Sequence, residues 1–457
     1  MGAKQQKNQL SLAFMADSRG ETPTAATQGT EAAMAKLRTE SPVSDERVME
    51  EMVSRENLRR ALQRVKANQG SPGIDGMTVG ELPQYLKHQW PSIREQLLSG
   101  TYTPQPVQRV EIPKPDGGVR KLGIPTVLDR FIQQAMLQVL QAKWDASFSD
   151  HSYGFRPHRS AHQAVEQAQQ YIAEGYRWVV DLDLEQFFDR VNHDKLMGTL
   201  AKRLQDKRVL KLIRGFLQAG VLEGGLVSPT EEGTPQGGPL SPLLSNLVLD
   251  ELDKELERRG HRFVRYADDS NIYVRSLRAG ERVMKRIWRF ITRRLKLVVN
   301  EAKSAVARPW ERKLLGFSFT RHRVPKRRIA PQAVKRFKQR IRTLTQRTRG
   351  RRLETLVEQV NSYLRGWHGY FGFCQTPSVF GEFDAWLRRR LRSYVWKQWG
   401  RTGYRELRRR GVSRKLAWNT AKSAHGPWRL SQSPALSIAL PAAFFDSLGL
   451  LRLAAPH

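Results

Sequence analysis

Residues Arg177–Leu184 combine a run of apolar side chains with two aspartates, Asp181 and Asp183. The valines and leucines predict a strand that is buried within a sheet. A carboxylate buried among such side chains is costly unless its pKa shifts or a cation neutralises it. The segment therefore indicates a metal site that is built on a buried strand.

Two further aspartates, Asp268 and Asp269, lie at the turn of a predicted hairpin with strands over 262–266 and 270–274. By itself such a turn is usually solvated, so the pair gains weight only together with the strand-borne acid upstream. Three carboxylates from two adjacent strands can hold two Mg²⁺ ions about 3.5–4 Å apart, the arrangement that transfers a nucleotidyl group in line. We therefore predict a catalytic and metal-binding site that combines an acid of this strand, Asp181 or Asp183, with Asp268 and Asp269.

The other predicted elements mix strands and helices without a regular βαβ repeat, which favours an α+β fold over a doubly wound sheet. A hairpin with basic residues at its tip is expected over 107–124. Helices are expected over about 45–68, 127–148, 193–218, 240–259 and 279–297, and a strand near 313–319.

The charge of the chain is far from balanced, with 78 Lys+Arg against 44 Asp+Glu and a net charge of +34. A surplus of this size repels itself unless a polyanion neutralises it, and nucleic acid is the expected polyanion. A soluble basic protein without a dedicated ligand is the alternative. The surplus is concentrated in residues 321–416, which hold 27 Lys+Arg and 5 Asp+Glu. Aromatic residues at helical spacing in the same region predict a separate α-helical unit over about 326–400.

Cys374 is the single cysteine, which excludes an internal disulfide framework and a CxxC zinc cluster. A reducing cytoplasm fits this composition. No apolar run has the length of a membrane span, and the N-terminus lacks the order of a signal peptide. Residues 1–45 are expected to be a mobile leader.

Several motifs follow one another along the chain in a fixed order. They are Gly70–Thr78, Ile112–Pro125, Ser152–Pro157, Asp183–Asp189, Gly233–Pro242, Tyr266–Asp269, Leu297–Lys303 and Leu315–Phe317. In this order the series resembles the successive blocks of reverse transcriptases encoded by bacterial group II introns. The resemblance covers about residues 50–400.

The resemblance implies a right-hand polymerase, with fingers and palm over 46–325 and an α-helical thumb or maturase domain over 326–400. It implies an RNA-directed DNA polymerase with two Mg²⁺ ions, Mn²⁺ being an alternative. Many relatives carry an HNH nuclease with paired cysteines, which this chain lacks, so endonuclease activity is not expected. Residues 401–457 are expected to be a short basic extension, a remnant of a DNA-binding segment.

The resemblance also assigns roles around the acidic site. The metal-binding aspartate of the family lies five positions before an aromatic residue, which selects Asp183 with Phe188 and leaves Asp181 as a rival. The resemblance also assigns Leu184 to the metal site. Phe188 would clash with a ribose 2′-hydroxyl, and plain core packing is the alternative. Asp189 is expected to cap or pair locally.

Four further residues would contact the incoming nucleotide. Lys114 and Arg120 resemble cations that grip the triphosphate, the alternative being a solvated basic hairpin. Gln236 would line the nucleotide, and Lys303 would protonate pyrophosphate, although a surface lysine is an equal expectation.

The nucleic-acid contacts follow from the same resemblance. Paired glycines would let the template backbone approach closely, while basic residues would hold phosphates of a duplex and of intron RNA. The predicted contacts are Arg156, Gly237, Gly238, Lys326, Arg327, Arg328, Lys335, Arg336, Arg388, Arg389 and Arg390.

The expected partners are group II intron RNA, an RNA template with a DNA primer, a DNA target and dNTPs, in a bacterial cytoplasm close to the nucleoid and without a membrane. Two rival functions remain open. One is a splicing maturase without polymerase activity. The other is a reverse transcriptase of a defence or diversity-generating system.

Overall fold

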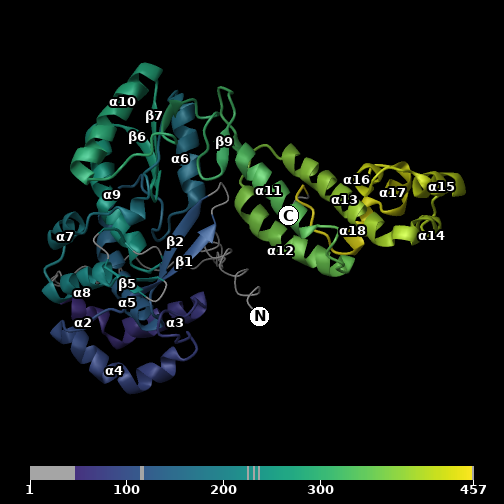
Figure 1. Cartoon of the computed structure of the whole chain (residues 1–457). Helices are drawn as coiled ribbons and strands as arrows, with labels where there is room; N and C mark the ends of the chain where they lie inside the picture. Colours follow the sequence, from purple (N-terminus) through teal and green to yellow (C-terminus); the bar gives the residue numbers. More distant parts are fainter. Residues whose placement is uncertain (1–46, 114–117, 224–225, 230–231, 235–236, 455–457) are drawn as a thin grey trace, which may run out of the picture. The chain divides into compact units, whose positions relative to one another are not determined.

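The computed structural model describes residues 47–454, except 114–117, 224–225, 230–231 and 235–236. These residues form two compact units that divide between Arg308 and Pro309. The first unit is built from two β-sheets with helices around them, and the second is almost entirely helical (Figure 1). The α+β class predicted from the sequence is confirmed.

The N-terminal part of the first unit is helical. Its helices are α2 (Val48–Met52), α3 (Arg55–Asn68), α4 (Leu82–Ser99) and α5 (Val127–Trp144). The single helix expected over 45–68 is wrong in one respect: Ser54 is extended, at φ −64° and ψ 144°, and separates α2 from α3. Helix α3 packs along α5, where Ala61 and Phe131 are buried.

A four-stranded sheet in the order β2-β1-β4-β5 carries the first predicted hairpin. Its strands are β1 (Val107–Pro113), β2 (Val119–Ile124), β4 (Val221–Glu223) and β5 (Leu226–Ser228). Strands β1 and β2 pair antiparallel with Gln108 opposite Ile124. The hairpin predicted over 107–124 is therefore confirmed in its described part.

A second four-stranded sheet, in the order β6-β7-β3-β8, forms the centre of the first unit. Its strands are β3 (Trp178–Leu182), β6 (Arg262–Tyr266), β7 (Asp269–Val274) and β8 (Ala305–Ala307), with α6 (Ala161–Ala173), α9 (Ser241–Arg258) and α10 (Leu277–Phe290) packed against the sheet. Gly280 lets α10 approach closely, since a Cβ atom there would lie 2.4 Å from Val306 Cγ1 and 3.7 Å from Val180 Cγ2. One face of this sheet is thus covered by α10.

The segment expected as one helix over 193–218 is two helices, α7 (His193–Ala201) and α8 (Lys207–Gln218). Asp206 starts the second helix, because its carboxylate accepts hydrogen bonds from the backbone N–H of Arg208 and of Met49. Helix α10 continues into a π-helix over Ile291–Leu295.

The second unit packs its helices around aromatic side chains. Its elements are β9 (Phe317–Phe319), β10 (Arg327–Ile329), α11 (Pro331–Leu344), α12 (Leu353–Phe371), α13 (Ser378–Trp399), α14 (Gly403–Arg409), α15 (Arg414–Lys422), α16 (Pro427–Leu430), α17 (Pro434–Ala439) and α18 (Ala442–Ser447). The ring of Phe337 lies 4.4 Å from Trp367 and 4.7 Å from Phe383, measured between centroids. Residues 403–447 are a set of packed helices with Leu436 and Phe445 fully buried.

Among the residues described here, no helix combines the length and apolar character needed to cross a lipid bilayer.

Candidate active site

The carboxylate of Asp183 stands at the end of a buried strand. Strand β3 ends at Leu182, and the backbone of the next residue is fixed by a neighbouring loop. Asn300 N–H donates to the carbonyl of Asp183 over 2.8 Å, and Asp183 N–H donates to Ser304 Oγ over 3.1 Å. Lys303 Nζ lies 3.7 Å from Asp183 Oδ2, so this lysine, singled out from the sequence, is beside the predicted catalytic acid.

The β6–β7 hairpin brings Asp268 and Asp269 to the same end of the sheet. Strand β3 pairs antiparallel with β7, and Leu182 is opposite Ser270. One position further along the two strands are Asp183 and Asp269. Asp269 is also opposite Tyr266 of β6, with Asp268 in the turn between them. Two segments distant in the sequence thus converge, as the sequence analysis predicted.

The electrostatics of this end of the sheet favour a cation. Burial raises the pKa of Asp268, and the negative charge of Asp183 raises it further, while Arg120 opposes the shift. Two carboxylates that repel each other in a half-buried site fit a divalent cation. Within the described residues, however, no three His, Cys, Asp or Glu side chains lie close enough together to form a metal site by themselves. Asp269 is exposed at the edge of the site.

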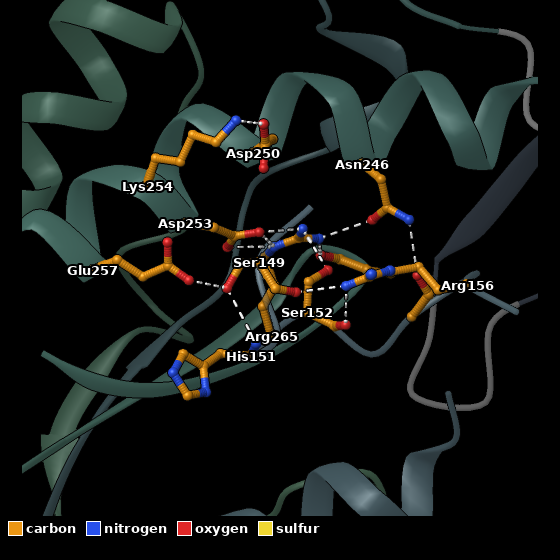
Figure 2. A network of polar contacts seen from close by, with 12 residues as sticks. Ser149, His151, Ser152, Arg156, Asn246, Asp250, Asp253, Lys254, Glu257 and Arg265 are labelled. Atoms are coloured by element: carbon orange, nitrogen blue, oxygen red, sulfur yellow. Dashed lines mark hydrogen bonds and ion pairs between the residues drawn. The ribbon is translucent and has the colours of Figure 1, made fainter. Parts of the chain in front are cut away.

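A buried arginine behind the turn holds it in place (Figure 2). Arg265 is fully buried in β6, and its Nε lies 2.7 Å from Asp253 Oδ1 on α9. Nη1 donates to Asn246 Oδ1 over 3.0 Å and to the carbonyl of Ala267 over 2.9 Å. Because Ala267 directly precedes Asp268, the guanidinium fixes the backbone that carries the predicted catalytic acid.

The segment that contains Ser152 and Gly154 supports the same turn. Ser152 Oγ accepts from Arg265 Nη2 over 2.7 Å, and Asn246 Nδ2 donates to the carbonyl of Gly154 over 2.9 Å. A Cβ atom on Gly154 would lie 2.3 Å from the backbone nitrogen of Ala267, so only glycine fits here. Ala267 itself has φ +56°, a conformation that non-glycine residues rarely adopt and that this packing enforces.

Comparison with known proteins identifies the family. Residues 112–319 match the family described as reverse transcriptase (RNA-dependent DNA polymerase), and residues 334–413 match the group II intron, maturase-specific domain. The chain belongs to the group II intron reverse transcriptases with a maturase domain.

Several curated proteins of this reverse transcriptase family are similar to the chain. Protein YkfC of Escherichia coli (strain K12) is 41% identical over 193 residues, which cover 41% of this chain and 51% of that protein. Group II intron-encoded protein LtrA of Lactococcus lactis subsp. cremoris is 39% identical over 195 residues, covering 42% and 32%. The matched part thus spans about half or less of these relatives. A chain titled partial Cas6-RT-Cas1--Cas2 complex is 26% identical over 54% of this chain and 42% of its own, but its TM-score of 0.35 supports no conclusion.

The other predicted site residues of the first unit differ in their burial and contacts. Phe188 is half-buried and packs edge-on against Phe187, with 5.3 Å between ring centroids. Arg120 is exposed on β2, and Lys114 and Gln236 lie outside the described residues. The nucleotide-binding roles of these residues stay predictions.

Arg156 was expected to bind nucleic acid, but the structure gives it another role. Its side chain is buried and donates five hydrogen bonds, to the carboxylate and carbonyl of Asp145 and to the carbonyls of Ser149 and Ser152. Five is the number that a guanidinium can donate. Arg156 therefore fixes the segment that supports the turn carrying Asp268, and it has no donor left for a phosphate.

Gly237 and Gly238 were expected to admit template backbone, and the structure supplies a different reason for glycine. A Cβ atom on Gly237 would lie 2.7 Å from the carbonyl oxygen of Gly123, and one on Gly238 would lie 2.5 Å from Gln133 Oε1. Gly237 also has φ +130°. At Gly237 a side chain would meet backbone, so glycine allows close packing there, whereas at Gly238 it would meet the end of the Gln133 side chain, which can move. The contact of both glycines with template stays a prediction.

The basic residues of the second unit that were predicted to bind nucleic acid fall into two groups. Lys326, Lys335 and Arg336 are exposed. The others are partly buried and engaged. Two of them lie over aromatic rings, Arg327 at 3.7 Å from Phe373 and Arg389 at 3.9 Å from Trp428. Two others donate hydrogen bonds, Arg328 to the carbonyl of Trp310 and Arg390 to Thr345 Oγ1. Arg388 is half-buried. The exposed group is better placed for phosphate binding.

Sequence reasoning missed Arg265, Asp253 and Asn246. The sequence did contain a signal, because Arg265 follows apolar residues within the strand Arg262–Tyr266. A charged side chain in a buried strand needs a buried partner. The same reasoning applies to Asp183, which also follows apolar residues. The sequence did not show that the partner lies on α9.

Proposed function

We propose that this chain is an RNA-directed DNA polymerase that copies intron RNA into cDNA, and that it binds its group II intron RNA to assist splicing and mobility. The observation that supports polymerisation best is the convergence of Asp183 and Asp268 at the end of the central sheet. The reverse transcriptase match over residues 112–319 supports the same reaction.

The reaction would transfer a deoxynucleoside monophosphate to the 3′-end of a primer on an RNA template. Asp183 and Asp268, with Asp269 and the backbone of Leu184, would hold two Mg²⁺ ions or Mn²⁺. Such ions activate the 3′-hydroxyl and stabilise the leaving pyrophosphate. The repulsion between Asp183 and Asp268 is the property of this chain that a cation would relieve.

The remaining roles belong to side chains around the acids. Lys114, Arg120 and Gln236 would bind the incoming dNTP, and Phe188 would exclude a 2′-hydroxyl. Lys303 lies near Asp183, where it could reach the triphosphate side of the site and protonate pyrophosphate. The exposed Lys326, Lys335 and Arg336 would hold phosphates of the duplex and of the intron.

The polymerase proposal is tested by primer extension. Wild type is compared with Asp183→Ala and Asp268→Asn on an RNA template with a DNA primer, Mg²⁺ and dNTPs. We expect both variants to lose extension by a factor of about 10³ or more, because each removes charge that stabilises the reacting phosphates. Intron RNA binding should be largely retained.

The control variant is Asp181→Asn, since this residue is the rival acid and its carboxylate accepts from Asn271 Nδ2 on the adjacent strand. Extension by this variant should stay within about tenfold of wild type. No extension by wild type would favour a splicing factor without polymerase activity. Loss only in Asp181→Asn would move the catalytic role to that residue.

The maturase proposal is tested by splicing of an intron RNA in vitro. The match of residues 334–413 to a maturase-specific domain supports it. Splicing that is equally fast with and without the protein, over a range of Mg²⁺ concentrations, would contradict the maturase role.

A further inference from the structure

Six arginines of the first unit line one open cavity of about 610 Å³. They come from the end of α9, from α10 and from the π-helix that follows it. The lining residues are Arg258, Arg259, Arg286, Arg289, Arg293 and Arg294, together with Phe290.

The basic surface continues beyond the cavity along α10. Exposed basic residues follow one another at intervals of three or four positions, at Arg278, Arg282, Lys285, Arg289 and Arg293. Residues at this spacing lie on one side of a helix. With a rise of about 1.5 Å per residue, the stripe is about 20 Å long.

Acidic side chains neutralise only part of this charge. Glu255 holds Arg258 at 2.8 Å and Arg259 at 2.7 Å, and Glu251 lies 3.8 Å from Arg294. Among the described residues, Arg286, Arg289 and Arg293 have no hydrogen-bond or ion-pair partner. So many like charges on rigid helices repel one another unless an anion binds between them.

A neighbouring histidine reports the same positive field. Burial lowers the pKa of His261, and the charges of Arg259 and Arg286 lower it further. The cavity is thus a place where a cation is disfavoured and an anion is attracted.

The cavity lies on the opposite side of the central sheet from the catalytic aspartates. Helix α10 packs on the face that carries Val180 and Val274. Side chains alternate along a strand, so Asp181 and Asp183 belong to the other face. A molecule bound at the cavity would therefore not be the template and primer in the catalytic site.

We propose that the cavity and the stripe along α10 bind folded RNA, with phosphates on the arginines and an unpaired nucleotide in the cavity. Arginine binds phosphate through two N–H groups at once. This cavity is wide open to solvent, so a base that has left its stack can reach Phe290 and the guanidinium planes and stack on them. Regular duplex DNA presents no such base. The proposal does not depend on polymerase activity.

The test measures binding of a labelled RNA hairpin with a single-stranded tail to the full chain. Saturating unlabelled RNA–DNA primer–template duplex is present, so that the primer–template site is filled. The variant Arg286→Gln/Arg289→Gln/Arg293→Gln should bind the hairpin on the order of tenfold more weakly than wild type. The slope of log affinity against log salt should fall by about 2–3, because three phosphate contacts are removed.

The matched control is Lys202→Gln/Lys207→Gln/Lys211→Gln. It removes the same charge from three exposed positions, one just after α7 and two on α8. Its hairpin affinity should stay within about twofold of wild type, and both triple variants should melt at the temperature of wild type because the altered side chains are exposed. Equal affinity of wild type and the arginine variant, or equal weakening by the control, would overturn the proposal. So would binding of a DNA hairpin of the same sequence as tightly as the RNA.

A second measurement locates the contact directly. Photocrosslinking of the RNA tail should label the peptide that contains Phe290 in wild type, and labelling confined to other peptides would contradict the assignment. The Asp183→Ala variant should keep this binding, so failure of the polymerase proposal and failure of this one are separate outcomes.

Discussion

The two units of this reverse transcriptase treat arginine differently. In the first unit the buried arginines are bound by carboxylates, as Arg265 is by Asp253 and Arg156 by Asp145. Among its described residues the second unit has no fully buried arginine, and its partly buried ones lie on aromatic rings or donate to carbonyls, as Arg389 does on Trp428 and Arg392 to Leu440. Exposed pairs such as Arg409–Glu406 are exceptions.

The composition explains the difference. Residues 321–416 have 5 Asp+Glu for 27 Lys+Arg, so aromatic faces and carbonyls must take the place of carboxylates. Carboxylate pairs can fix a turn rigidly, which a catalytic site needs. An uncompensated positive surface is better suited to a polyanion.

The largest effect on stability is expected when the buried pair of the first unit is broken. Arg265→Met leaves Asp253 buried without its partner, and we expect the free energy of unfolding to fall by about 3–5 kcal/mol. Urea unfolding followed by circular dichroism measures it. The double variant Arg265→Met/Asp253→Leu should recover much of this loss. A loss in the double variant as large as in the single would show that the charge pair is not the cause.

A smaller loss of stability is expected where Gly154 packs closely against Ala267 of the β6–β7 turn. Gly154→Ala would place a methyl group 2.3 Å from the nitrogen of Ala267, and we expect a loss of about 1–3 kcal/mol together with reduced primer extension. Gly198→Ala is the control, because Gly198 lies in α7 with nothing within 4 Å of its added Cβ. This control should be stabilised by about 0.5–1 kcal/mol. Unchanged extension in Gly154→Ala would mean that the turn tolerates displacement.

Acid should weaken the carboxylate pairs of the first unit. Burial alone would raise the pKa of Asp206, but hydrogen bonds from Arg208 and from Met49 N–H outweigh it and the pKa is lowered. Its carboxylate therefore stabilises the fold fully above about pH 4 and loses this contribution as the pH falls through the folded pKa. Asp206→Asn should be about 1–2 kcal/mol less stable than wild type at pH 7. The difference should shrink toward pH 2, and a difference independent of pH would exclude this explanation.

The smallest effect is expected on the aromatic side of the comparison. Arg389→Met keeps the aliphatic stem over Trp428 but removes the cation, and we expect a loss of about 0.5–1 kcal/mol in thermal unfolding. A loss as large as that of Arg265→Met would erase the distinction between the two units.

The sequence was most informative where one local pattern decides the structure. Alternating residues predicted the β1–β2 hairpin, and an apolar run predicted β3 with Asp183 at its end. The positions of α9 and of the β6–β7 turn were predicted in the same way. The convergence of a strand-borne acid with the Asp268–Asp269 turn was inferred from the cost of buried carboxylates, and the resemblance to a family supported it and selected Asp183, because strand order is not local information.

The failures of prediction share a physical cause, since each depends on a distant partner. Asp206, the N-cap of α8, is also held by Met49 N–H, which lies more than 150 residues earlier in the chain. Arg156 looked like a surface cation because its acceptors, three of them backbone carbonyls, have no sequence signature. Gly237 is glycine because of Gly123, which only the folded chain brings near.

The bond from Arg265 to the Ala267 carbonyl gives the turn that carries Asp268 an inner side and an outer side. The inner side is committed to the interior of the protein, where any replacement disturbs several partners at once. The outer side carries Asp268 and Asp269, and Asp269 is exposed. A substitution on this side should therefore leave the backbone of the turn in place, whereas a substitution at Arg265 releases its bonds to Asp253, Asn246 and Ser152 at once.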